Sequence, residues 1–159
     1  MKDKVIKSIK GFTLVELLIV IAIIGVLSAL LMANFIGVRQ RARDAQRKSD
    51  LRQIQSALEL YRSDLGLYPT TQNGPACDTA FSSGTTIYMA KVPCDPTNSS
   101  FYNSNYYYYS DGSVYYVVAC LENSSDSQAK TTTDSEYQAV PSISNSGCSS
   151  NYFYIVASP

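Results

Sequence analysis

The residue whose chemistry stands out is Glu16, a carboxylate near the start of an otherwise apolar stretch. It is the only charged side chain between Lys10 and Arg39. A carboxylate at the centre of a membrane helix costs roughly 2.5–3.5 kcal/mol on an insertion scale, so such a group is expected to have a partner and a function. The chemistry that relieves this cost is ion pairing with an amine, in which each group offsets the desolvation of the other.

The element that carries Glu16 is an apolar segment long enough to span a membrane. As a helix, Phe12 to Ile36 would reach about 37 Å, against about 30 Å for the core of a bilayer. Four lysines between residues 2 and 10, against the single Asp3, mark the cytoplasmic end. A cleaved secretory signal has a shorter apolar core of about 7–15 residues. We therefore expect this segment to be kept as a membrane helix.

The run from Gly11 to Glu16, Gly-Phe-Thr-Leu-Val-Glu, resembles the processing motif of the type IV pilin superfamily, which includes the pseudopilins of type II secretion and of competence. The resemblance implies that a prepilin peptidase cleaves after Gly11 and methylates the new amino terminus at Phe12. It also implies that Glu16 attracts this terminus on a neighbouring subunit during filament assembly. The alternative is a plain signal-anchor helix in which Glu16 pairs with a threonine or a lipid headgroup.

Helical periodicity continues beyond the membrane segment. Apolar residues recur at spacings of three and four, with polar residues on the other faces. Gly66 stands where a left-handed helix cap is expected, and Pro69 follows it. The stretch from Leu58 to Thr70 also resembles the helix end of major pseudopilins and related pilins. We expect one long helix that ends near Leu65, with an apolar stripe formed by Leu51, Ile54, Leu58, Tyr61 and Leu65.

After Gly66 the composition changes to Tyr, Ser, Thr, Asn and Gly, which favours strands and turns. An Asp-Gly turn at 111–112 between two β-rich runs predicts a hairpin over 106–121. Further strands are expected at 152–157 and 86–90, and 123–147 is expected to be mostly loop. The predicted fold is therefore the α+β pilin fold, with a leader at 1–11, a membrane or filament-core helix at 12–36, the amphipathic half of that helix at 37–65 and a β-rich head at 66–159.

Four cysteines lie beyond the membrane helix, and in an exported domain they predict two disulfides. Three pairings are open. Sequential pairing, Cys77–Cys94 and Cys120–Cys148, is favoured because it needs no crossing. By resemblance, the second pair encloses the loop that many pilins use for subunit contacts. A zinc site is disfavoured, because the chain has no Cys-x-x-Cys pair and no histidine.

The formal net charge of zero conceals a segregation along the chain. Residues 39–52 carry six basic and two acidic side chains, a net of +4, whereas the chain from Ile54 carries three basic and nine acidic ones, a net of −6. One expectation is that basic helix segments stack against acidic heads of other subunits, and another is that the basic face lies near anionic lipid. The acidic head disfavours binding to a nucleic-acid backbone.

All 13 tyrosines lie at or beyond Tyr61. A tyrosine-dense surface could bind glycans or single-stranded nucleic acid by stacking. Packing of the rings on a small sheet is the favoured explanation, because tyrosine is a common strand residue.

Calcium is the one cofactor that the resemblance raises, since major secretion pseudopilins hold a calcium ion late in the head. Glu122, Asp126, Asp134 and Glu136 are oxygen ligands in a comparable region. Their spacing matches no calcium-loop pattern. No other cofactor is expected.

Enzymatic activity is disfavoured, because the chain has no histidine, no phosphate-binding glycine loop and no Gly-x-Ser-x-Gly motif. The leading expectation is a structural subunit of a type IV pilus-like filament. It would be stored in the inner membrane, trimmed by prepilin peptidase, and polymerised by the inner-membrane assembly platform into an extracellular pilus or a periplasm-spanning pseudopilus. The alternatives are a major pseudopilin of a type II secretion or DNA-uptake machine, a minor tip subunit or adhesin that binds glycan or DNA, and a membrane protein that never polymerises.

Overall fold

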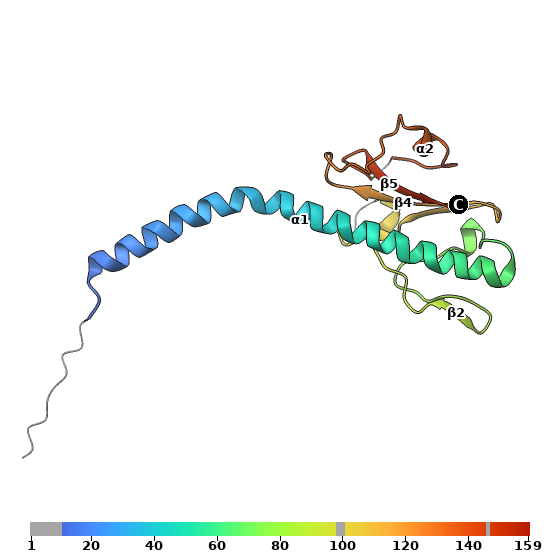
Figure 1. Ribbon diagram of the computed structural model, residues 1–159, viewed down its shortest axis with the longest axis horizontal. Coiled ribbons are helices and arrows are strands. Elements are labelled where there is room, and N and C mark those ends of the chain that lie inside the picture. The colour runs from blue at the N-terminus through green and yellow to red at the C-terminus, as the bar shows by residue number, and fades with distance from the viewer. Residues whose placement is uncertain (1–10, 98–100, 146) are drawn as a thin grey trace, which may run out of the picture. The chain divides into compact units, whose positions relative to one another are not determined.

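The computed structural model describes residues 11–97, 101–145 and 147–159, so residues 1–10 of the expected leader lie outside the described residues. The chain divides into two compact units, Met1–Val38 and Arg39–Pro159. The elements, labelled in part in Figure 1, are α1 (Leu14–Leu65), η1 (Thr71–Asn73), β1 (Phe81–Ser83), β2 (Thr86–Met89), η2 (Phe101–Ser104), β3 (Tyr107–Ser110), β4 (Tyr115–Leu121), α2 (Ser135–Gln138) and β5 (Tyr152–Ala157).

The first unit contains the apolar start of α1. Its segment Leu14–Met32 has a mean hydropathy of 2.9 and is long and apolar enough to cross a membrane. The large apolar side chains of this segment are exposed in the isolated chain. A helix that is apolar all round is stable only when lipid or other protein covers it. A helix of the expected length and apolarity is therefore present, and its insertion in a membrane stays a prediction.

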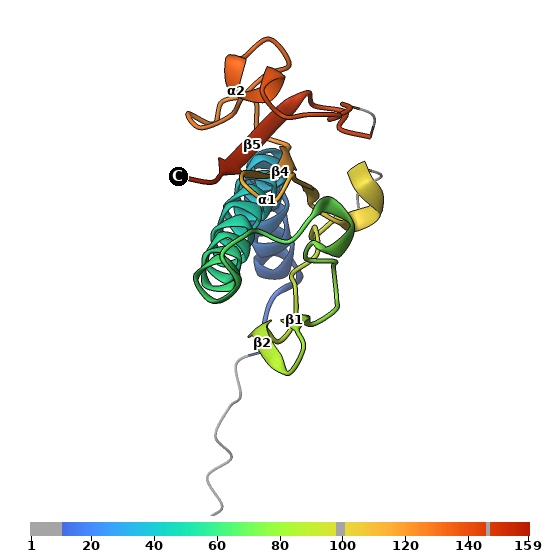
Figure 2. The ribbon, with the colours of Figure 1, turned by 90° about the vertical axis from the view of Figure 1, so that its right-hand side faces the viewer.

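In the second unit, α1 packs against one face of a three-stranded antiparallel sheet with the order β3-β4-β5. Figure 2 shows α1 on one side of β4 and β5 and α2 on the other. Leu51, Ile54 and Leu58 are buried in one cluster with Val117 of β4 and Val156 of β5. The α+β class expected from the sequence is therefore confirmed.

The predicted helical stripe is wrong at one residue. Leu65 is 49% exposed, whereas Leu58 is fully buried. The reason is that α1 ends at Leu65, where Gly66 takes the left-handed conformation at φ 80° and its N–H donates to the carbonyl of Arg62 at 2.7 Å. Leu65 does not belong to the core cluster that contains Leu58.

The opposite face of the sheet carries a second core. Phe153 of β5, Val118 of β4 and Tyr107 of β3 are buried there beneath Tyr137 of α2 and Phe101 of η2. The loop between β4 and β5 thus closes over the sheet. It was expected to be mostly irregular, and the short helix α2 within it was not predicted.

The turns form where the sequence predicted them. Asp111 Oδ1 accepts hydrogen bonds from the backbone N–H groups of Ser113 at 2.8 Å and Val114 at 3.0 Å, and Gly112 has a φ of 95°. This fixes the β3–β4 hairpin. The strands expected at 152–157 and 86–90 are present as β5 and β2, whereas β1, which pairs with β2, was not predicted.

Candidate functional site

The predicted processing site lies in a stretch without regular secondary structure immediately before α1. Gly11 has no other atom within 4 Å of the position that a side chain would take, and Phe12 is 87% exposed. The peptide bond between them is therefore open to an enzyme in this conformation. Whether it is cleaved is not tested by the structure, and cleavage and methylation at Phe12 stay predictions.

The carboxylate of Glu16 is bonded to Thr13, one turn before it. Oε2 of Glu16 accepts hydrogen bonds from the backbone N–H and the hydroxyl of Thr13, both at 2.8 Å, and the Glu16 N–H donates to the Thr13 hydroxyl at 3.2 Å. This reciprocal pairing is a capping box, which satisfies donors that the first turn of a helix leaves unpaired. The spacing Thr-x-x-Glu is the signal that could have predicted it.

The capping box engages only one oxygen of the carboxylate. Among the described residues, no hydrogen bond is made to Oε1 of Glu16. The group can therefore hold the helix start and still accept a hydrogen bond or an ion pair from outside its own chain.

A second constellation, which the sequence did not predict, centres on Arg47 of α1. Its side chain is 2% exposed and is surrounded by acceptors from three segments. The guanidinium donates to both oxygens of Asp95 at 2.7 and 3.0 Å, to Asp44 at 2.8 Å, to Glu122 at 2.8 Å and to the Thr97 hydroxyl at 2.9 Å. A buried charge needs such complete pairing to offset its desolvation.

We call Arg43, Asp44, Arg47, Lys48 and the side chains that pair with them the arginine cluster. It extends to the end of β4. Asp44 accepts hydrogen bonds from the backbone N–H groups of Glu122 at 3.0 Å and Asn123 at 2.8 Å, and Arg43 Nε donates to Glu122 at 2.7 Å. One turn further along α1, Lys48 pairs with Asp126. The cluster therefore fastens α1 both to the loop at 95–97 and to the segment that follows β4.

The charges of the cluster are mutually stabilised. Burial alone would lower the pKa of Arg47, but its hydrogen bonds to Asp95 and Glu122 outweigh burial and raise it. Burial would raise the pKa of Asp95, yet Arg47 and Thr97 hold it below its usual range. The pKa of Glu122 is lowered chiefly by the hydrogen bond from Arg43. These groups therefore stay ionised at neutral pH.

Asp50, a turn beyond Arg47, has a pKa that is shifted in the opposite direction from that of Asp95. It is 5% exposed, and Tyr106 donates its hydroxyl to Asp50 Oδ2 at 2.7 Å. Burial, with a smaller contribution from the charge of Asp95, raises the pKa of Asp50 despite that hydrogen bond. This carboxyl group thus titrates at a higher pH than Asp95.

The structure contains the disulfides Cys77–Cys94 and Cys120–Cys148, the two sequential pairs favoured by the sequence. Each disulfide adjoins the arginine cluster. Cys94 immediately precedes Asp95, and Cys120 lies two residues before Glu122. The covalent bonds therefore fix the two segments whose carboxylates bind Arg47.

The calcium candidates are not brought together. Glu122 is bound by two arginines, Asp126 by Lys48, and Asp134 accepts hydrogen bonds from the backbone and hydroxyl of Thr131 at 2.6 and 3.0 Å. Glu136 pairs with Lys130. Within the described residues, no group of three or more metal-ligating side chains is assembled. Calcium binding stays an untested prediction.

Tyrosines of the head lie mainly in the two cores. Those that are buried are Tyr68, Tyr106, Tyr107, Tyr108, Tyr115 and Tyr137. Hydroxyls of this set donate hydrogen bonds within the subunit, as in Tyr108 to the carbonyl of Pro69 at 2.6 Å and Tyr115 to Glu59 at 3.1 Å. Packing on the sheet accounts for these six residues.

Comparison with known proteins gives two family matches. The model of the prokaryotic N-terminal methylation motif matches residues 6–32, and that of type II secretion system (T2SS) protein G matches residues 34–136. The first match contains Gly11, Phe12 and Glu16, and the second contains the arginine cluster.

Individual relatives agree with these matches. The chain is 33% identical over 100 residues to type II secretion system core protein G of Klebsiella pneumoniae, covering 58% of this chain and 71% of the relative. It is 32% identical over 103 residues to the protein of that name from Escherichia coli, covering 58% and 69%, and 30% identical over 99 residues to that from Pseudomonas aeruginosa, covering 57% and 70%. No solved structure gave a significant match.

Proposed function

The chain belongs to the type II secretion system protein G family, and on that premise we propose that it is a major pseudopilin, a structural subunit that polymerises into a filament within a secretion machine. The observation that carries this proposal is the family match over residues 34–136, because it covers the second half of α1 and most of the head. The methylation-motif match supports it, because a subunit of this kind is trimmed before it polymerises.

The comparisons support the pseudopilin alternative better than the leading expectation of a long extracellular pilus. The curated relatives cited above are all named as core proteins of a secretion system. A DNA-uptake pseudopilus and a tip adhesin have no comparable support. The absence of enzymatic activity, expected from the sequence, is supported indirectly by the same relatives.

In the proposed maturation, a membrane peptidase cuts between Gly11 and Phe12 and methylates the new amine of Phe12. Support comes from the exposure of this bond and from the capping box that begins at Thr13, because α1 keeps its start when residues 1–11 are removed. Oε1 of Glu16 then receives the ammonium group of a neighbouring subunit. The neutralisation of both charges favours entry into a low-dielectric filament core.

The proposed partners are further copies of this chain, the prepilin peptidase and the assembly platform of the inner membrane. The proposed location is the inner membrane before assembly and a periplasm-spanning pseudopilus after it. The apolar span Leu14–Met32 supports a membrane-anchored precursor.

Deletion of the gene in the native host tests this function. We expect secreted enzymes to accumulate in the periplasm while long surface pili remain, and an intact copy of the gene to restore secretion. Mass spectrometry of the restored protein should find Phe12 as a methylated first residue. Normal secretion together with the loss of long surface filaments would instead assign the chain to a pilus.

A further inference from the structure

The second unit, Arg39–Pro159, neutralises most of its basic residues internally, and two exceptions share one side of α1. Arg43, Arg47 and Lys48 pair with carboxylates, whereas Arg41 and Arg52 are exposed and form no ion pair with any described residue. Their spacing, 52 minus 41 or eleven residues, is close to three helical turns, so the two side chains lie on one stripe.

Two exposed carboxylates likewise have no ion-pair partner among the described residues, and they lie together at the other end of the head. Asp64 is in the last turn of α1, and Asp111 begins the β3–β4 turn. The backbone N–H of Tyr68 donates to the carbonyl of Gly112 at 2.9 Å and so holds the two segments side by side.

Exposed apolar side chains accompany these carboxylates. Leu65 is 49% exposed, Leu67 is 60% exposed and Val114 is 39% exposed. All three belong to the same helix end and hairpin turn. We call Asp64, Leu65, Leu67, Asp111 and Val114 the distal surface. Apolar side chains flanked by unpaired charges are typical of a surface that another protein covers.

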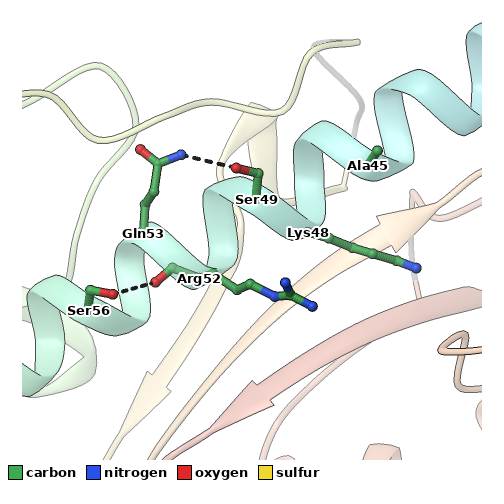
Figure 3. A pocket seen from close by; sticks show the side chains of 6 residues that line it. All are labelled: Ala45, Lys48, Ser49, Arg52, Gln53 and Ser56. Atoms are coloured by element: carbon green, nitrogen blue, oxygen red, sulfur yellow. Dashed lines mark hydrogen bonds between the residues drawn. The ribbon is translucent and has the colours of Figure 1, made fainter.

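The arginine-bearing side of α1 is hollowed. Small and polar residues line a depression of about 430 Å³, and Figure 3 shows Arg52 extending from α1 to the same side as Lys48 while Gln53 bonds to Ser49. A second hollow of about 680 Å³ continues from Arg52 past Leu60 to Pro159. We call this surface the helix stripe, formed by Arg41, Ala45, Ser49, Arg52, Ser56, Leu60 and Pro159.

We propose that the distal surface of one subunit docks on the helix stripe of a second copy of this chain, with Asp64 and Asp111 facing Arg41 and Arg52. The inference rests on the proposed function and names the contact between heads. In this contact, two cations pair with two carboxylates. The apolar residues of the distal surface pack against Leu60, Pro159 and the small residues of the helix stripe.

The charges of the two surfaces cannot pair with one another within one subunit. Arg41 and Asp64 are separated by 23 residues (64 minus 41) of one helix, or about 35 Å. A surface that fits a different surface on the next copy forms a head-to-tail contact, and repetition of such a contact builds an open helical filament. This is the symmetry that a pseudopilus needs.

Lipid headgroups are the competing partner for exposed arginines next to a membrane helix. Recognition of anionic lipid typically uses clusters of about 4–8 basic residues. In this part of α1, Arg43, Arg47 and Lys48 are already paired with carboxylates of their own subunit. A second protein that offers two carboxylates is therefore the better partner for Arg41 and Arg52.

Cross-linking of the full chain in membranes tests the contact. Cysteines replace one arginine and one aspartate in the same chain, giving R41C or R52C combined with D64C or D111C. A short bismaleimide should join at least one of these four variants into ladders, whereas Lys91→Cys combined with Asp64→Cys should stay monomeric because Lys91 lies on neither surface. The proposal would be overturned if none of the four variants formed ladders. The same result is expected if the arginines bind lipid instead of a second subunit.

Charge exchange gives a second measurement. Arg52→Asp and Asp64→Arg should each reduce filament mass at least fivefold, and the double variant should recover at least half of it. If both single variants formed as much filament as the unaltered chain, the proposed contact would be overturned. If the cysteine variants cross-link through these positions but the unaltered chain forms no filaments when expressed with the secretion machinery, the contact stands and the proposed function fails.

Discussion

Arg47 and Asp95 form a two-point ion pair across 48 residues of sequence, in which Nε donates to Oδ2 at 2.7 Å and Nη2 donates to Oδ1 at 3.0 Å. Both side chains are almost fully buried. Because the planar guanidinium matches both carboxylate oxygens, this pair fixes the position of the loop that follows Cys94 relative to α1.

Replacement of Arg47 by methionine should strongly destabilise the head. The variant leaves Asp95 and Asp44 as buried carboxylates without a cation, and the loss of one partner of a buried pair costs about 3–5 kcal/mol. Urea unfolding of the full chain in detergent, followed by tyrosine fluorescence, measures this change. Arg52→Met is the matched control and should change stability by about 0.5 kcal/mol or less, because Arg52 is exposed. Equal stability of the two variants would contradict the role of Arg47.

The stability of the head should fall on acidification. The pKa of Asp95 is lowered because Arg47 and Thr97 outweigh burial, and that of Glu122 is lowered chiefly by Arg43. A lowered folded-state pKa contributes stability above the unfolded-state value, about 4, and this contribution is lost as the pH falls through the folded-state value. Urea midpoints should therefore drop below about pH 4, and the drop should be smaller in Arg47→Met.

The substitution Asp50→Asn should increase the stability of the head as the pH rises. Burial raises the pKa of Asp50 above its ordinary value, so its contribution to stability is fully present below that value and is lost as the pH rises through the folded-state pKa. The asparagine carbonyl can still accept the hydrogen bond of Tyr106. The variant should gain stability relative to the natural chain as the pH rises above about 4, whereas the exposed control Asp64→Asn should change stability by about 0.5 kcal/mol or less. A gain that is independent of pH would count against this assignment.

Substitutions at Glu16 and Thr13 should distinguish the role of the Glu16 carboxylate in filament assembly from its role in capping α1. Glu16→Ala removes both the cap and the carboxylate, and we expect a processed, membrane-held subunit that assembles at least tenfold less. Thr13→Ala removes the threonine hydroxyl from the cap, at about 1 kcal/mol, but keeps the carboxylate, so it should be processed and assemble. Immunoblots of sheared filaments measure both. Abundant filaments from Glu16→Ala would remove the role proposed for the carboxylate.

Loss of the Cys120–Cys148 disulfide should cost about 3–4 kcal/mol, because it closes a segment with a sequence separation of 28. The double variant Cys120→Ser, Cys148→Ser isolates this effect. Loss of Cys77–Cys94, with a separation of 17, should cost slightly less. Unfolding with and without reductant checks both values, and a variant without cysteines should not respond to reductant.

Local sequence signals predicted the elements that depend on local chemistry. Gly66 ends α1, the Asp111-Gly112 turn forms the hairpin, and β5 occupies 152–157, because each is set by the conformational preferences of a few adjacent residues. β1 was missed because its three residues, Phe-Ser-Ser, have no alternating pattern. Phe81 stabilises it by packing against Tyr88 of the paired strand β2 and against Tyr61 of α1, which lies 20 residues away in sequence (81 minus 61).

The arginine cluster was not predictable because its partners lie far apart in the chain. The basic segment at 39–52 and the acidic head were visible in the sequence, and the expectations drawn from them were stacking between subunits or contact of the basic face with anionic lipid. The structure shows Arg43, Arg47 and Lys48 neutralised within their own subunit. Composition reveals that charges are separated, but only the fold determines which ones meet.

The position of the arginine cluster on α1 has a mechanical consequence. Within the second unit, Arg43, Asp44 and Arg47 attach the first turns of α1 to two separate segments, whereas Leu51 and Leu58 attach the later turns to the sheet. To pull this part of α1 away from the sheet, a force would have to break buried ion pairs as well as apolar contacts. The two adjoining disulfides keep the anchoring segments from unravelling under such a force.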